Sequence, residues 1–181
     1  MNYTFTHQGS NVAGENISQV EFSAPRIFPP GPAIRSFPWD AEAAPAKGLF
    51  GFNSRDMRSR SFNLLRTRLL KLAQAKGWRL FGVASATPRV GKSFISANLA
   101  AALSRNSELD VYLLDFDLRR SSIASTFEIE KSEGLQQYLS GELLTLDRVA
   151  VRPEGERLTI LPSFRSAGHS SELLAGKPMN R

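Results

Sequence analysis

The sequence predicts an α/β fold in which a parallel sheet of about three strands is flanked by helices and preceded by a disordered tail. Short apolar runs alternate with segments of helical periodicity from residue 79 onward, which is typical of parallel strands joined by helical crossovers. Six of the ten prolines lie between Pro25 and Pro45, where neither a helical nor a strand period is present. We therefore expect residues 1–55 to be a disordered tail and residues 56–181 to hold the folded domain.

Composition excludes several classes of protein. The chain has 181 residues, which is enough for one domain and an appendage, and it has no cysteine. Disulfide frameworks and thiolate metal sites are therefore excluded, and two histidines make a zinc site improbable. No stretch approaches the ~18 apolar residues of a membrane span, and the first twenty residues lack the features of a secretory signal. The net charge of +6 is compatible with acidic partners or with solubility alone.

The tail carries aromatic residues that a plain linker would not need. Those residues are Phe22, Phe28, Phe37, Trp39, Phe50 and Phe52. They could dock on a partner or on the folded domain, whereas a tethering linker with incidental aromatics is the simpler interpretation.

The elements of the folded domain follow from hydrophobic spacing. In chain order we expect a helix over 61–75 closed by Gly77, a buried strand over 79–85, a helix over 94–105 with Ile95, Leu99 and Leu103 inward, a strand over 110–116, a helix over 133–141, a strand over 157–163, and a further helix after Ser170. The region that holds the first helix is also strongly basic, because ten Lys or Arg and no acid lie between Asp56 and Glu108. We interpret this as a solvated face beside a phosphate site, with anionic lipid or an acidic partner as alternatives.

The clearest motif lies between the first strand and the next helix. It reads Ala86, Thr87, Pro88, Arg89, Val90, Gly91, Lys92 and Ser93, which is the spacing of a P-loop with alanine at its first position. Backbone N–H groups of such a loop surround nucleotide phosphates, the lysine reaches the β and γ oxygens, and the serine hydroxyl ligates Mg²⁺. The fold is thus predicted to be of the P-loop NTPase type. Arg89 occupies a position where glycine would more easily adopt a positive φ, which could weaken nucleotide binding.

Two acids follow the second predicted strand. Asp115 and Asp117 end the apolar run VYLLDFD, and carboxylates at this edge of a parallel sheet project toward Mg²⁺ and the γ-phosphate. The alternative is that they begin a loop and pair with Arg119 and Arg120. We expect Lys92, Asp115 and Asp117 to be catalytic, and Ser93 and Asp115 to ligate the metal.

Together these motifs resemble the cytoplasmic domain of bacterial tyrosine kinases of capsular and exopolysaccharide synthesis. The resemblance covers about residues 61–176 and rests on the P-loop, the Asp-x-Asp-x-Arg at 115–119, GLQQYLSGE at 134–142, LTILPS at 158–163 and SELL at 171–174. It implies that ATP and Mg²⁺ are the cofactors, that Asp115 and Asp117 serve the metal and the attacking tyrosine hydroxyl, and that the partner is a membrane polysaccharide co-polymerase. It also implies a cytoplasmic location, with attachment to the inner face of the plasma membrane through the partner left open, and no nucleic-acid partner.

The sequence departs from that family in three ways. A Walker B acid, further strands and a tyrosine-rich C-terminal segment are expected in the family and do not occur before Arg181, so we expect a C-terminally truncated chain. The family's oligomerisation motif aligns on Arg60, Asn63 and Arg66 and matches only at the last, so the resemblance does not carry ring assembly to this chain. Whether the chain is itself an enzyme stays open. The alternatives are a non-catalytic P-loop adaptor of the co-polymerase and a small-molecule kinase of the adenylyl-sulfate kinase type.

Overall fold

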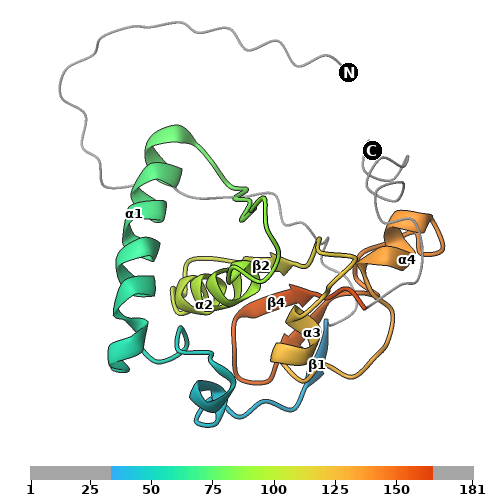
Figure 1. Ribbon diagram of the computed structural model, residues 1–181, viewed down its shortest axis with the longest axis horizontal. Coiled ribbons are helices and arrows are strands. Elements are labelled where there is room, and N and C mark those ends of the chain that lie inside the picture. Colours follow the sequence, from blue (N-terminus) through green and yellow to red (C-terminus); the bar gives the residue numbers. More distant parts are fainter. Residues whose placement is uncertain (1–33, 165–181) are drawn as a thin grey trace, which may run out of the picture.

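The computed structural model describes residues 34–164 as a mixed sheet with helices packed against it (Figure 1). The strands are β1 (Arg35–Phe37), β2 (Val111–Leu114), β3 (Val151–Pro153) and β4 (Leu158–Leu161). The α-helices are α1 (Arg60–Lys76), α2 (Lys92–Ser104), α3 (Ile123–Thr126) and α4 (Leu135–Ser140), and two 3₁₀ helices, η1 (Ala44–Lys47) and η2 (Met57–Ser59), precede α1.

The sheet is only partly parallel, which corrects the expectation of a parallel sheet. Its order is β1-β3-β4-β2, in which β1 pairs with β3 and β2 pairs with β4 in parallel fashion. β3 and β4 pair antiparallel, because residues 154–157 between them are too few for the crossover that parallel neighbours require. The predicted strands at 110–116 and 157–163 correspond to β2 and β4, whereas β1 and β3 were not predicted.

The predicted buried strand at 79–85 is wrong. This segment joins no strand of the described sheet and lies exposed, with the Leu80 side chain 87% accessible. A strand requires a neighbour that satisfies its backbone N–H and C=O groups. β2 is the edge strand of the described sheet, and residues 79–85 do not pair with its open side. Apolar composition therefore identified a β-prone segment without placing it in the sheet.

The helices predicted from periodicity are confirmed, with small shifts at their ends. Gly77 is the C-cap of α1 and Gly141 is the C-cap of α4, and both glycines have the positive φ that a left-handed C-cap needs. The inward face of α2 matches the expectation only in part, because Leu99 is buried and Leu103 half-buried as expected, whereas Ile95 is exposed and small residues such as Ala97 and Ala101 are buried. The helix expected after Ser170 lies outside the described residues.

The N-terminal boundary predicted at residue 55 is also wrong, because residues 34–55 are part of the folded domain. β1 belongs to the sheet, and Leu49 is fully buried in the core. Trp39 contacts Phe127 at 5.4 Å and Phe52 at 5.5 Å between ring centroids. Burial of these large apolar side chains offsets the entropy of ordering a proline-rich segment. Phe37, Trp39 and Phe52 thus anchor this segment on the core, whereas Phe22 and Phe28 lie outside the described residues.

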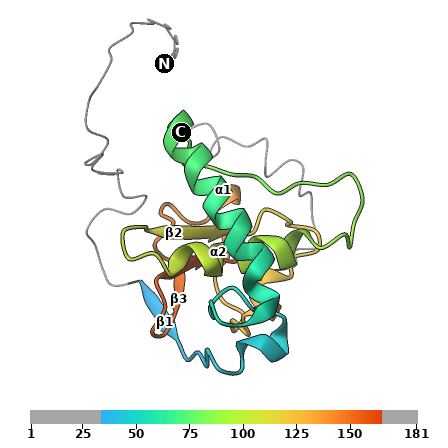
Figure 2. The ribbon, with the colours of Figure 1, turned by 90° about the vertical axis from the view of Figure 1, so that its left-hand side faces the viewer.

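Two hydrophobic clusters cover the two faces of the sheet. Leu113 and Ile160 face the larger cluster, which includes Ala97 and Phe127, while Leu161 faces a smaller cluster that includes Leu135. α2 lies against β2 and β4, so the start of α2 and the end of β2 are held by the same packed layer (Figures 1 and 2). Within residues 34–164, no helix is long and apolar enough to cross a membrane.

Candidate functional site

The loop before α2 adopts two left-handed backbone conformations. Arg89 has φ 60° and Gly91, the N-cap of α2, has φ 91°. Glycine adopts this region freely, but for a residue with a Cβ it costs about 1–2 kcal/mol. Arg89 therefore adopts the positive φ for which a glycine would be expected at this position. The turn brings the chain directly into the first residue of α2, which is Lys92.

Lys92 points back across its own loop. Its Nζ donates a hydrogen bond to Oγ of Ser85 at 3.2 Å, and this hydroxyl in turn donates to the carbonyl of Thr87 at 2.7 Å. Ser85 was not singled out from the sequence, although it immediately precedes the motif. Residues 86–90 are exposed, and Gly91, Lys92 and Ser93 are partly buried. A positive charge and an uncapped helix N-terminus therefore border one accessible turn, which is an arrangement that attracts anions.

Asp115 is enclosed by its own loop immediately after β2. Its carboxylate accepts hydrogen bonds from Oγ of Ser121 at 3.0 Å, from the backbone N–H of Asp117 at 3.1 Å and from the backbone N–H of Ile123 at 3.3 Å. Only 5% of the residue is accessible. Burial raises the pKa of Asp115 above its ordinary value, while the three hydrogen bonds act in the opposite direction. Asp115 therefore organises the turn, and Ser121 is a contributor that the sequence motif did not reveal.

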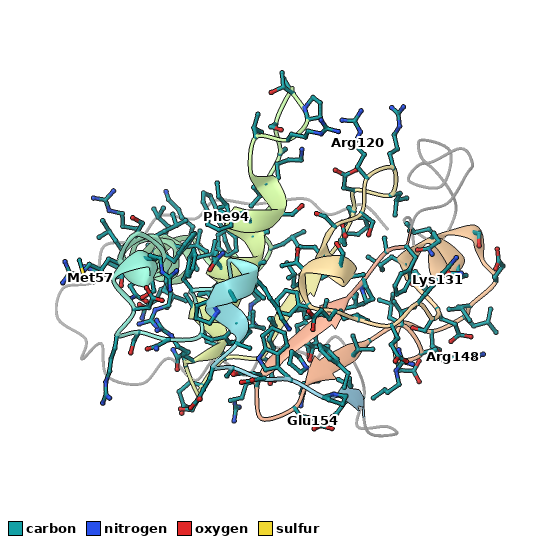
Figure 3. All side chains as sticks on the ribbon, turned by 60° about the horizontal axis from the view of Figure 1, so that its bottom comes forward. Met57, Phe94, Arg120, Lys131, Arg148 and Glu154 are labelled. Atoms are coloured by element: carbon teal, nitrogen blue, oxygen red, sulfur yellow. The ribbon has the colours of Figure 1, made fainter. Side chains whose placement is uncertain are left out.

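Asp117 is in a more open position than Asp115. It is only partly buried, and its Oδ1 accepts the backbone N–H of Arg120 at 3.0 Å. The ion pairs suggested between these acids and Arg119 or Arg120 are not formed, since among residues 34–164 both arginines are exposed and neither takes part in a salt bridge. Arg120 extends into solvent on the same side of the molecule as the loop before α2 (Figure 3).

The predicted site residues come from two adjacent elements. The C-terminal end of β2 and the N-terminal end of α2 lie on the same side of the molecule in both ribbon views (Figures 1 and 2). No hydrogen bond within the described part of the chain joins the loop at 86–93 to Asp115 or Asp117. Nor do the described residues include a cluster of three or more His, Cys, Asp or Glu that could hold a metal ion unaided. Any metal here would need oxygen ligands from a bound phosphate as well.

We expect Asp115→Asn to gain stability relative to the unchanged chain as the pH rises. The raised pKa means that the folded state holds its proton more tightly than the unfolded state does. The contribution of Asp115 to stability is therefore greatest in acid and decreases as the pH rises from its ordinary pKa of 3.8 through the raised folded value. Asparagine does not titrate, and it can keep most of the hydrogen bonds. Urea unfolding of both chains between about pH 3 and pH 7 measures this, and a difference that does not change with pH would contradict it.

Comparison with known proteins identifies relatives among bacterial kinases. The chain is 34% identical over 124 residues to the tyrosine-protein kinase ptk of Acinetobacter johnsonii, a match that covers 68% of this chain and 16% of that protein. It is 33% identical over 98 residues to a putative tyrosine-protein kinase in the cps region of Klebsiella pneumoniae, covering 54% of this chain and 13% of that protein. The chain thus spans about one sixth of the length of these relatives or less. No protein-family model matches it.

A solved structure supports the same relationship. The BceF tyrosine kinase domain superimposes with a TM-score of 0.63 and 25% sequence identity, covering 77% of this chain and 56% of that domain. The arrangement of sheet and helices described above is therefore similar to that of a bacterial tyrosine kinase domain.

Proposed function

The chain is homologous to a segment of the bacterial tyrosine-protein kinases, and we propose that residues 86–93 bind the phosphates of ATP in the presence of Mg²⁺. The observation that carries the proposal is the geometry of the loop before α2. An exposed turn with two left-handed residues leads into an uncapped helix N-terminus, and Lys92 lies across it. A phosphate oxygen can replace the 3.2 Å contact between Lys92 and the Ser85 hydroxyl, because an ammonium group binds a charged oxygen more strongly than a neutral hydroxyl.

We assign roles to Ser93, Asp115 and Asp117 from their positions at the start of α2 and after β2. Ser93 lies on the first turn of α2, where its hydroxyl can ligate Mg²⁺ beside a bound phosphate. Asp117, the more accessible acid, is suited to the attacking hydroxyl, and Asp115 would act on the metal once the turn at 117–121 releases one carboxylate oxygen. ATP supplies the transferable phosphoryl group, and these side chains would bind and orient it.

The biological role is proposed by analogy with the relatives. One relative is named for the cps region, and we propose that this chain belongs to a kinase that regulates polysaccharide synthesis or export through a membrane co-polymerase. Such a partner would hold it at the inner face of the membrane. A second candidate is a non-catalytic adaptor, because the left-handed Arg89 and the enclosed Asp115 would both oppose catalysis. The small-molecule kinase alternative loses support, since the relatives found are protein kinases.

Lys92→Ala is expected to weaken nucleotide binding by about 10- to 100-fold, because a hydrogen bond to a charged group contributes about 1.5–3 kcal/mol. The measurement is a titration of a fluorescent ADP analogue against the 181-residue chain, with and without Mg²⁺. Lys71→Ala is the matched control, since it removes the same charge from an exposed position on α1. If the Lys92→Ala titration coincides with that of the unchanged chain, residues 86–93 are not the phosphate site.

A further inference from the structure

Two arginine side chains form hydrogen bonds between α1 and the C-terminal end of α2. Figure 2 shows α1 running across α2, and Arg66 of α1 donates from Nη1 to the carbonyl of Ala102 at 3.1 Å. In the opposite direction, Arg105 at the C-terminal cap of α2 donates from Nη2 to the side-chain oxygen of Asn63. Both acceptors are neutral oxygens. Each arginine is partly buried, so neither guanidinium is simply a solvated surface charge.

Three further donors in this pair are buried and without a partner. They are Nε of Arg66 and both Nε and Nη1 of Arg105, none of which has a hydrogen-bond acceptor among the described residues. Buried N–H groups of native proteins are nearly always satisfied, and an unsatisfied charged donor costs more free energy than a neutral one. All three unsatisfied donors belong to the guanidinium groups of Arg66 and Arg105. One acceptor between these two groups would satisfy them together.

The charge of the pair is also unbalanced. The sequence has no Asp or Glu between Asp56 and Glu108, so neither helix can supply a carboxylate. The three ion pairs within residues 34–164 involve other residues, namely Lys47–Glu128, Arg58–Asp56 and Arg148–Glu133. Burial, followed by the nearby charge of Arg66, lowers the pKa of Arg105. Two partly buried cations near each other thus each donate to a neutral oxygen, and neither forms a salt bridge with another described residue.

From this geometry we propose that Arg66 and Arg105 form a binding site for a phosphate-type oxyanion in the seam between α1 and α2. A tetrahedral oxyanion accepts hydrogen bonds from two guanidinium groups at once and neutralises both. The site is separate from the loop at 86–93, because α2 runs 13 residues from Lys92 to Ser104, which is about 20 Å at 1.5 Å per residue. It therefore does not depend on whether that loop binds nucleotide. The same N–H groups would also donate to a carboxylate of a second copy of the chain, and the experiment separates these two sources.

The test is a titration of inorganic phosphate, at constant ionic strength, into the 181-residue chain carrying Lys92→Ala, which removes the loop lysine as a competing site. Binding is followed through the side-chain Nε–H signals of arginine in nitrogen-15 NMR spectra. We expect the signals of Arg66 and Arg105 to shift and saturate together. Arg105→Gln should weaken this binding about 10-fold or more, since a bidentate charged contact is lost. Arg68→Gln, which removes an exposed charge from the same helix, should change it less than about 2-fold.

Three results would overturn the proposal. One is the absence of saturable shifts in the Nε–H signals of Arg66 and Arg105. Another is an equal loss of phosphate binding in Arg105→Gln and Arg68→Gln, which would indicate a diffuse basic surface. The third is self-association of the chain, measured by sedimentation, that increases with protein concentration, is abolished by Arg105→Gln and is unaffected by phosphate. A carboxylate of a second copy would then be the occupant. Comparison of circular dichroism spectra of the variants confirms that each one is folded.

Discussion

A chain that begins at residue 56 is expected to be largely unfolded under conditions in which the full chain is folded. The deletion removes β1 and with it one of the two pairing partners of β3. It also removes Leu49, which is 1% accessible, and Trp39 and Phe52, which contact Phe127. Each large apolar side chain contributes about 1.5–3 kcal/mol when buried, and a whole domain has a net stability of only about 5–15 kcal/mol. The combined loss is comparable with the total.

The measurement for this deletion is urea unfolding followed by far-ultraviolet circular dichroism. The matched control is a chain that begins at residue 34, which retains every contact described for the N-terminal segment and should unfold cooperatively. If the chain from residue 56 unfolds with the same midpoint as the control, then residues 34–55 are a dispensable appendage. The boundary suggested by the proline-rich composition would then be correct.

Asn98→Ala is expected to be the most damaging single substitution, with a loss of about 3–5 kcal/mol. Asn98 is 0% accessible. Its amide oxygen accepts the N–H groups of Phe50 at 2.6 Å and Gly51 at 3.0 Å, and its amide nitrogen donates to the carbonyls of Gly48 at 2.8 Å and Phe94 at 2.9 Å. Alanine would leave the N–H groups of Phe50 and Gly51 and the carbonyl of Gly48 without this partner, whereas the carbonyl of Phe94 keeps its helical hydrogen bond within α2. Each buried unsatisfied group costs about 1–3 kcal/mol. The segment at 48–51 would then lose its attachment to α2.

The urea midpoint of Asn98→Ala compared with that of Asn53→Ala tests this account. Asn53 is exposed, and its side chain accepts one hydrogen bond, from the N–H of Arg55 at 2.9 Å. The control should therefore lose less than about 1 kcal/mol. Similar losses in the two variants would show that the buried amide is replaceable by water, and that other contacts hold the segment on α2.

Local patterns predicted the helices and the candidate loop well. α1, α2 and α4 follow from hydrophobic spacing, and Gly77 and Gly141 end their helices because the left-handed C-cap is a property of the residue itself. The loop at 86–93 was found in the same way, since its residues are consecutive. Arg89 was identified from the motif as a residue in an unfavourable position, and it does adopt a positive φ.

Contacts between distant parts of the chain could not be predicted in this way. Proline content concealed the order of residues 34–55, because the partners of Trp39 lie near residue 127 and those of the 48–51 segment lie on α2. The apolar segment at 79–85 has the composition of a strand, yet it pairs with no strand of the described sheet. The sequence motif predicted different roles for Asp115 and Asp117 but not their different exposure, which the surrounding turn decides by burying Asp115.

The sequence by itself determined the helices α1, α2 and α4, the position of the loop with P-loop spacing and which family the chain resembles. Each of these depends on residues within a few positions of one another, whose spacing sets backbone conformation directly. The tertiary structure alone decided the direction of β3 against β4, the inclusion of residues 34–55, the enclosure of Asp115 and the meeting of Arg66 with Arg105. Those features depend on which surfaces meet after folding, and burial and pairing over long sequence separations leave no periodic signal in the chain.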